Sequence, residues 1–186
     1  MKVHLLNLFA NQLTKDILEQ IVGILSDGHD KLIVRESMLS IASGFIPTLV
    51  NNASTVEGAS TLSSMLNDVG KLEDLPHILS EAQKSDLFIN NGKYFTHTLF
   101  GIEIKDHVNR LVKKYKLSSK SATTLVYISA SILEMLLAAL KQSHLDVDKL
   151  AKVLTKEDRR AQRAHNQNSG PFFGIFDIIF GLEKVF

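Results

Sequence analysis

The feature that most constrains the fold is the stretch from 120 to 140, KSATTLVYISASILEMLLAAL, which is apolar on nearly every side. At helical spacing, large apolar side chains cover more than half of its circumference: Leu125, Val126, Ile128, Ile132, Leu133, Leu136, Leu137 and Leu140. A helix this apolar is buried in a protein core or in a membrane. We therefore predict a central buried helix over residues 118–141, capped at Ser118 or Ser119.

A protein core is the environment that we favour for this helix. Its uninterrupted apolar run is shorter than the roughly 20 residues that cross a bilayer. Glu134 lies in its middle, where a carboxylate is costly in lipid. The opening MKVHLLNLFANQLTKD is not a convincing signal peptide, and no small-residue cleavage site follows it. We expect a cytoplasmic protein that neither spans a membrane nor binds to its surface.

Composition narrows the class of protein further. A chain of 186 residues is long enough for one domain with a real core. Its formal net charge of +1 gives no overall attraction to nucleic acid or anionic lipid. Because cysteine is absent, disulfides and cysteine-based metal or nucleophile chemistry are excluded, which fits a reducing compartment. We predict no cofactor.

Apolar spacing along the chain predicts a single-domain, all-α bundle of about eight helices, with no strand. Residues 3–26 form one long or two short amphipathic helices, and Thr14 is placed to cap the second. Asp30 opens a long helix that should kink at Pro47 and close at Asn51-Asn52.

Turn and cap residues divide the middle of the chain. Ser54 and Glu57 have the spacing of a capping box, which starts the next helix. A short helix is expected over 76–82. Asn90-Asn-Gly92 predicts a turn, because Asn and Gly tolerate positive φ. A short aromatic helix then follows over 94–100, and Gly101 suits its end.

Two passages of the chain are weakly alike. KDILEQIV at 15–22 resembles KDHVNRLV at 105–112, and each leads through a short loop into a long apolar helix. Such pairs cannot bury their apolar faces alone, so they should pack together as one core. We predict a helical domain over 1–168, with related units at 1–68 and 93–155, followed by a tail over 169–186. Chance similarity between amphipathic helices explains the likeness equally well.

Three segments also carry a family resemblance. They read LLNLFANQL at 5–13, IPTLVNNASTVEGASTL at 46–62 and YFTHTLFG at 94–101, and an amphipathic and a very apolar helix follow. In this order they resemble the bacterial domain-of-unknown-function family 937, which has YidB-like relatives. The resemblance covers about residues 1–155, although the loops around 69–91 are charged where relatives are often glycine-rich. It implies an all-helical fold and a bacterial source, and it assigns no activity.

Four titratable side chains are candidates for a site. Glu103 and His107 are four residues apart, a spacing that lets two side chains hold one metal ion, and His97 is close in sequence. A zinc site needs a third protein ligand, so surface or capping roles are favoured and no metal is predicted. Glu134 in an apolar helix should need a partner or a raised pKa. A small-ligand or enzyme pocket near Glu134, His97 and His107 is therefore an alternative function, and no catalytic residue is assigned.

Basic residues gather in two places. Residues 105–120 hold six Lys or Arg against one Asp, and a second cluster comprises Arg159, Arg160, Arg163 and His165. They give a second alternative, weak nucleic-acid binding through basic helix faces. A solvated helix face explains them better, so we do not expect a nucleic-acid partner.

The tail FFGIFDIIFGLEKVF is rich in Phe and Ile. Its apolar face would comprise Phe172, Ile175, Phe176, Ile179 and Phe180. Docking back on its own bundle and contact with a partner or a second copy both stay open. The candidate interaction residues are Phe172, Phe173, Phe176, Ile179 and Phe180. We predict a non-catalytic role in protein–protein interaction or self-association.

Overall fold

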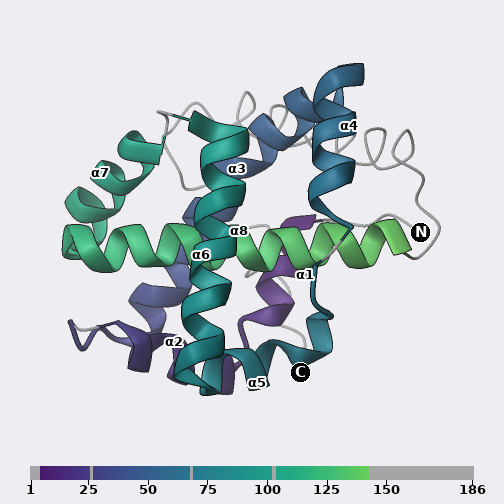
Figure 1. Ribbon diagram of the computed structural model, residues 1–186. Coiled ribbons are helices and arrows are strands. Elements are labelled where there is room, and N and C mark those ends of the chain that lie inside the picture. Colours follow the sequence, from purple (N-terminus) through teal and green to yellow (C-terminus); the bar gives the residue numbers. More distant parts are fainter. Residues whose placement is uncertain (1–4, 26, 68, 102–103, 143–186) are drawn as a thin grey trace, which may run out of the picture.

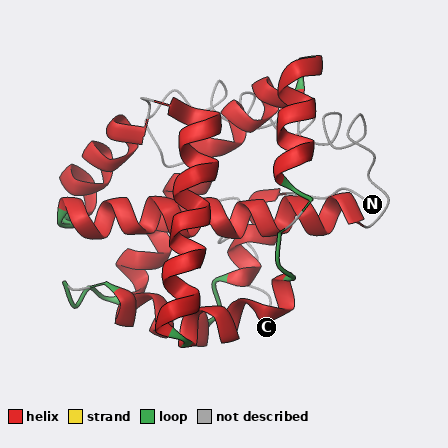
Figure 2. Ribbon diagram, viewed as in Figure 1, coloured by secondary structure: helices red, strands yellow, loops and turns green. Residues whose placement is uncertain are grey.

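The computed structural model describes residues 5–25, 27–67, 69–101 and 104–142. Within these ranges the chain forms α-helices, a short 3-10 helix and no β-strand, which confirms the predicted all-α bundle (Figure 2). The elements are α1 (Leu5–Gln12), α2 (Lys15–Ile24), α3 (Lys31–Ala53), α4 (Val56–Met65), η1 (Leu72–Asp74), α5 (Leu75–Ser80), α6 (Ala82–Phe100), α7 (Ile104–Tyr115) and α8 (Ser119–Gln142).

Helix α8 is the centre of the bundle, as the sequence predicts. It contacts α6 most extensively, and it also contacts α1, α3 and α7 (Figure 1). Every residue from Ile128 to Ala138 is buried. At its start, the backbone N–H of Ser121 donates to the hydroxyl of Ser118 at 3.1 Å, so Ser118 is the cap.

Among the described helices, α3 and α8 are long and apolar enough to cross a membrane by length and composition alone. The length argument against a span was therefore wrong for α8, which has 24 residues. Core helices of soluble proteins pass the same test, and 72% of the apolar window of α8 is buried inside the bundle. The contacts of α8 with four other helices are what favour a core position.

Helices α2 and α3 begin where the sequence predicts. The Thr14 hydroxyl accepts a hydrogen bond from the Ile17 N–H, and the Asp30 carboxylate accepts one from the Leu32 N–H at 2.6 Å. Within residues 5–25 the chain thus forms two short helices, α1 and α2, which is the second of the two predicted alternatives. Helix α3 continues through Pro47 and ends at Ala53, just beyond the predicted stop.

The turn predicted at Asn90-Asn-Gly92 was wrong. Helix α6 is continuous from Ala82 to Phe100, and Gly92 lies buried in its middle. A Cβ atom at Gly92 would lie 2.0 Å from the Tyr127 carbonyl oxygen of α8. Gly92 is thus a point of close approach between α6 and α8, which cross in Figure 1, and packing overrides its turn preference.

Smaller differences concern helix ends. The cap of α4 is Thr55, whose hydroxyl accepts from the Gly58 N–H at 3.1 Å. The predicted capping box at Ser54 was wrong because Ser54 caps the end of α3, where its hydroxyl donates to the Asn51 carbonyl at 2.6 Å. The short helix expected over 76–82 is α5, which begins at Leu75 and ends at Ser80.

The two passages of the weak repeat become α2 and α7, and each precedes a long apolar helix, α3 or α8. The related units and the division between a domain and a tail stay predictions, since their outer limits reach beyond Gln142.

Candidate functional site

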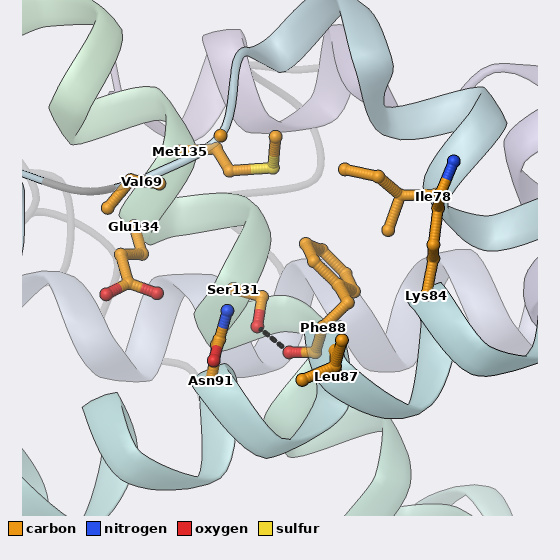
Figure 3. A pocket seen from close by; sticks show the side chains of 10 residues that line it. Val69, Ile78, Lys84, Leu87, Phe88, Asn91, Ser131, Glu134 and Met135 are labelled. Carbon is orange, nitrogen blue, oxygen red and sulfur yellow. Dashed lines mark hydrogen bonds between the residues drawn. The ribbon is translucent and has the colours of Figure 1, made fainter.

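A pocket of about 210 Å³ opens between α6 and α8, and we call it the Glu134 pocket. Its walls come from α5, α6, α8 and the loop before η1 (Figure 3). The lining residues are Val69, Gly70, Ile78, Lys84, Leu87, Phe88, Asn91, Ser131, Glu134 and Met135. Most are apolar, and the polar minority is where a ligand would be recognised.

The close crossing of α6 and α8 fixes the polar side of this pocket. The Ser131 hydroxyl donates to the Phe88 carbonyl at 2.6 Å, a buried bond that ties the two helices together (Figure 3). Glu134 follows Ser131 by three residues on the same face of α8. Because Gly92 carries no side chain, nothing separates the helix backbones here.

The Glu134 carboxylate is buried without a counter-charge. The residue is 8% exposed, and no hydrogen bond or ion pair joins it to any residue that the structure describes. Desolvation by burial raises the pKa of Glu134 to about 7. Lys84 lines the same pocket, but its ammonium group contacts Glu81 Oε1 at 3.1 Å and His77 Nε2 at 2.7 Å. The expectation of a buried, perturbed carboxylate is therefore confirmed.

A second pocket, of about 360 Å³, lies between α3 and α7, and we call it the His107 pocket. Its lining residues are Ser40, Ile41, His107, Arg110, Leu111, Lys113, Lys114 and Tyr115. His107 is 8% exposed, and its ring meets the edge of Phe45 with centroids 5.0 Å apart. Burial, and then the charge of Arg110, lowers the pKa of His107 to about 4. His107 is thus a neutral core residue at pH 7.

The predicted trio does not form one site. Glu134 and His107 line different pockets, and His97, exposed on α6 with its ring 6.3 Å from that of Tyr127, lines neither. Glu103 lies outside the described residues. Among the residues that are described, no three His, Cys, Asp or Glu side chains gather as a metal site. The expectation of a surface or capping role for His107 was wrong, because its ring is buried against Gly44 and Phe45 of α3.

The basic face of 105–120 lies on and beyond α7. Arg110 Nη2 is 3.0 Å from His107 Nδ1, and Lys114 Nζ stands 4.8 Å from the Tyr115 ring centroid. These cations therefore help to hold α7 and to line the His107 pocket. The second basic cluster and the five candidate residues of the tail lie outside the described residues.

Sequence reasoning missed the outward face of α6. Leu87 and Tyr94 are 60% and 66% exposed, among few large apolar side chains that the described residues expose so strongly. They are seven residues apart, with Asn91 between them, so all three share one helix face. The spacing was visible in the sequence, but the turn predicted at residues 90–92 separated the two residues.

A family model described as bacterial protein of unknown function (DUF937) matches residues 7–142. The chain belongs to this family. The match ends at the last residue of α8, so the DUF937 region is the described bundle. No curated protein and no solved structure matches the chain.

Proposed function

We propose that this DUF937 protein is a non-catalytic interaction module that self-associates through the outward face of α6. The observation that supports the proposal is the pair Leu87 and Tyr94, exposed on one face of a long helix. Single exposed apolar residues are common on protein surfaces, whereas two on one helix face beside an apolar pocket favour a contact with a partner.

The chemistry of this face suits a protein contact. Tyrosine supplies a large contact area with few rotatable bonds, which is why it is enriched among residues that dominate binding energy. Helix α6 is held firmly from behind, because Phe88, Phe95 and Leu99 are buried in the core. In a two-fold dimer the same face meets its own copy, so Leu87 and Tyr94 would be used twice.

Light-scattering mass in solution tests the proposal. The full chain should be a dimer, and Leu87→Ser with Tyr94→Ser should yield a monomer with an unchanged melting temperature. The matched control is Leu32→Ser with Val56→Ser, which removes two apolar residues that are 58% and 92% exposed elsewhere. A monomeric full chain, or a double variant of unchanged mass, would contradict self-association through α6.

The tail offers a rival surface for the same role. A chain ending at Ser169 lacks Phe172, Phe173, Phe176, Ile179 and Phe180. If this truncation becomes a folded monomer while the α6 variant stays a dimer, the tail carries the association and α6 does not. Phe176→Asp with Phe180→Asp should then reproduce the effect of the truncation.

A cytoplasmic location is part of the proposal. The chain contains no cysteine, as is usual where disulfides are not formed. Its two most apolar helices bury most of their apolar windows inside the bundle. Recovery of the expressed protein in a high-speed supernatant without detergent is the expected outcome, and recovery in washed membranes would contradict it.

A further inference from the structure

We propose that the Glu134 pocket binds an alkylammonium group, with the ammonium beside the Glu134 carboxylate and the hydrocarbon chain along the apolar wall. This role goes beyond self-association, because a small amine can enter the pocket of a single copy. The geometry that carries it is the side chain of Glu134, a residue only 8% exposed, which lines the pocket and has no hydrogen-bond or ion-pair partner among the described residues (Figure 3).

Three of the four polar side chains that line the pocket, those of Glu134, Ser131 and Asn91, can accept hydrogen bonds, whereas Lys84 only donates. An ionised carboxylate can only accept hydrogen bonds. The Ser131 hydroxyl donates its single proton to the Phe88 carbonyl, so its lone pairs are left to accept a hydrogen bond. Asn91 contributes an amide, which offers an acceptor oxygen and a donor NH2 group. A ligand that donates several hydrogen bonds and carries positive charge complements this set, and an ammonium group does both.

The size and the walls of the pocket limit the rest of the ligand. At about 210 Å³ it falls below the roughly 300–1,000 Å³ of sites for drug-sized ligands. A nucleotide or a large cofactor would not fit within this volume, whereas a short unbranched chain fits. Ile78, Leu87, Phe88 and Met135 supply an apolar wall, and the Phe88 ring can also attract a cation.

Charges around the pocket permit a cation to enter. Lys84 is the charged lining residue besides Glu134, and Glu81 and His77 hold its ammonium group. In Figure 3 Lys84 lies on the opposite side of the view from Glu134. Opposite charge at short range in a poorly hydrated site is a strong interaction, so the bound amine would replace the missing counter-charge.

The pH dependence follows from the acid itself. With a pKa of about 7, Glu134 is about one-tenth ionised at pH 6 and about nine-tenths ionised at pH 8. An alkylamine remains protonated throughout this range because its pKa is near that of lysine, about 10.4. Affinity should therefore rise about tenfold from pH 6 to pH 8. A neutral ligand that accepts a hydrogen bond from protonated Glu134 would show the opposite trend.

Titration of the full chain with n-pentylamine, followed by NMR, tests the proposal. Saturable shifts should map to α6 and α8, and binding should tighten between pH 6 and pH 8. Glu134→Gln keeps the shape of the side chain and should weaken binding at pH 8 about tenfold or more. Pentan-1-ol, the neutral analogue, should bind both proteins equally weakly.

Two controls separate the proposal from simpler effects. Glu73→Gln makes the same chemical change at an exposed residue outside the pocket and should leave affinity unchanged. A circular-dichroism melt of Glu134→Gln confirms that the variant folds, while the pH series needs no variant. Equal affinity of wild type and Glu134→Gln, or affinity that is flat or falls with pH, would overturn the proposal.

A second ligand distinguishes whether the ammonium group belongs to a small amine or to a lysine side chain of a partner protein. N-acetyl-lysine N-methylamide carries the same alkylammonium on a peptide backbone. If it binds as n-pentylamine does, a lysine side chain of a partner protein fits the pocket. If only the free amine binds, the ligand is a small molecule. Failure of both ligands would overturn the amine site and leave the mass measurements on α6 untouched.

Discussion

Glu134 and His107 are buried titratable residues that line different pockets, and the two are equally shielded at 8% exposure. Burial favours the neutral form of both, which raises one pKa and lowers the other. Their surroundings differ. His107 packs against Phe45 and Gly44 and contacts Arg110, whereas Glu134 has no hydrogen-bond or charge partner in the described part of the chain.

The difference indicates that His107 has a structural role, whereas Glu134 is available to bind a ligand. A histidine whose ring is enclosed by its neighbours contributes to stability as an uncharged core residue. A carboxylate that is desolvated without compensation costs stability, and such a cost is typical of groups kept for a function. Three predictions test this contrast between Glu134 and His107.

The largest change in stability should come from substituting the two glycines at close helix contacts, Gly92 between α6 and α8 and Gly44 between α3 and α7. At Gly92 a Cβ would meet the Tyr127 backbone oxygen at 2.0 Å, whereas at Gly44 it would meet the His107 ring at 2.5 Å. A ring can rotate and a helix backbone cannot. Gly92→Ala should therefore cost about 3 kcal/mol of unfolding free energy, and Gly44→Ala about 1 kcal/mol, after the gain in helix propensity. Urea unfolding at pH 7 measures both, and equal costs would remove the distinction between the two contacts.

The next effect concerns Glu134. Its folded-state pKa, about 7, lies above its unfolded value, so the folded state holds the proton more tightly. Stability contributed by the neutral acid is present at low pH and is lost as the pH rises from about 4.5 to 7. Glu134→Gln should therefore gain about 2 kcal/mol relative to wild type between pH 5 and pH 8. Thermal melts across that range test the prediction, with Glu73→Gln as the control that should follow wild type.

The smallest effect belongs to His107 and has the opposite sign. Its folded-state pKa, about 4, lies below its unfolded value of about 6.5, so the unfolded chain binds the proton more tightly. Stability is therefore lost as the pH falls from about 6.5 toward 4. His107→Leu should remove about 1 kcal/mol of this acid sensitivity between pH 7 and pH 5. If the variant and wild type lose stability in parallel, His107 is not the titrating group.

The parts of the fold that sequence predicts are those with local causes. The apolar periodicity of 120–140 places α8, and the oxygen atoms of Thr14 and Asp30 place the starts of α2 and α3. The turn predicted at residues 90–92 failed because the approach of Tyr127, a residue distant in sequence, decides the conformation of Gly92.

The candidate site also has parts that local sequence predicts and parts that only the fold defines. Burial of Glu134 follows from its own helix, so its perturbed pKa was predictable from the sequence. The pocket was not, because Val69, Ile78 and Asn91 reach it from segments whose relation to α8 only the fold defines. The grouping with His97 and His107 rested on proximity in sequence, and the packing of α7 against α3 separates those residues.

The central position of α8 also affects how the protein is made. Among the described helices, those that pack on α8 include α1, α3, α6 and α7, and all four precede it in the chain. The ribosome therefore releases Phe9, Phe45 and Phe95, each fully buried in the finished bundle, before the helix at its centre has emerged. Until residue 142 has left the exit tunnel, the nascent chain exposes an incomplete core, and it should depend on chaperones during that interval.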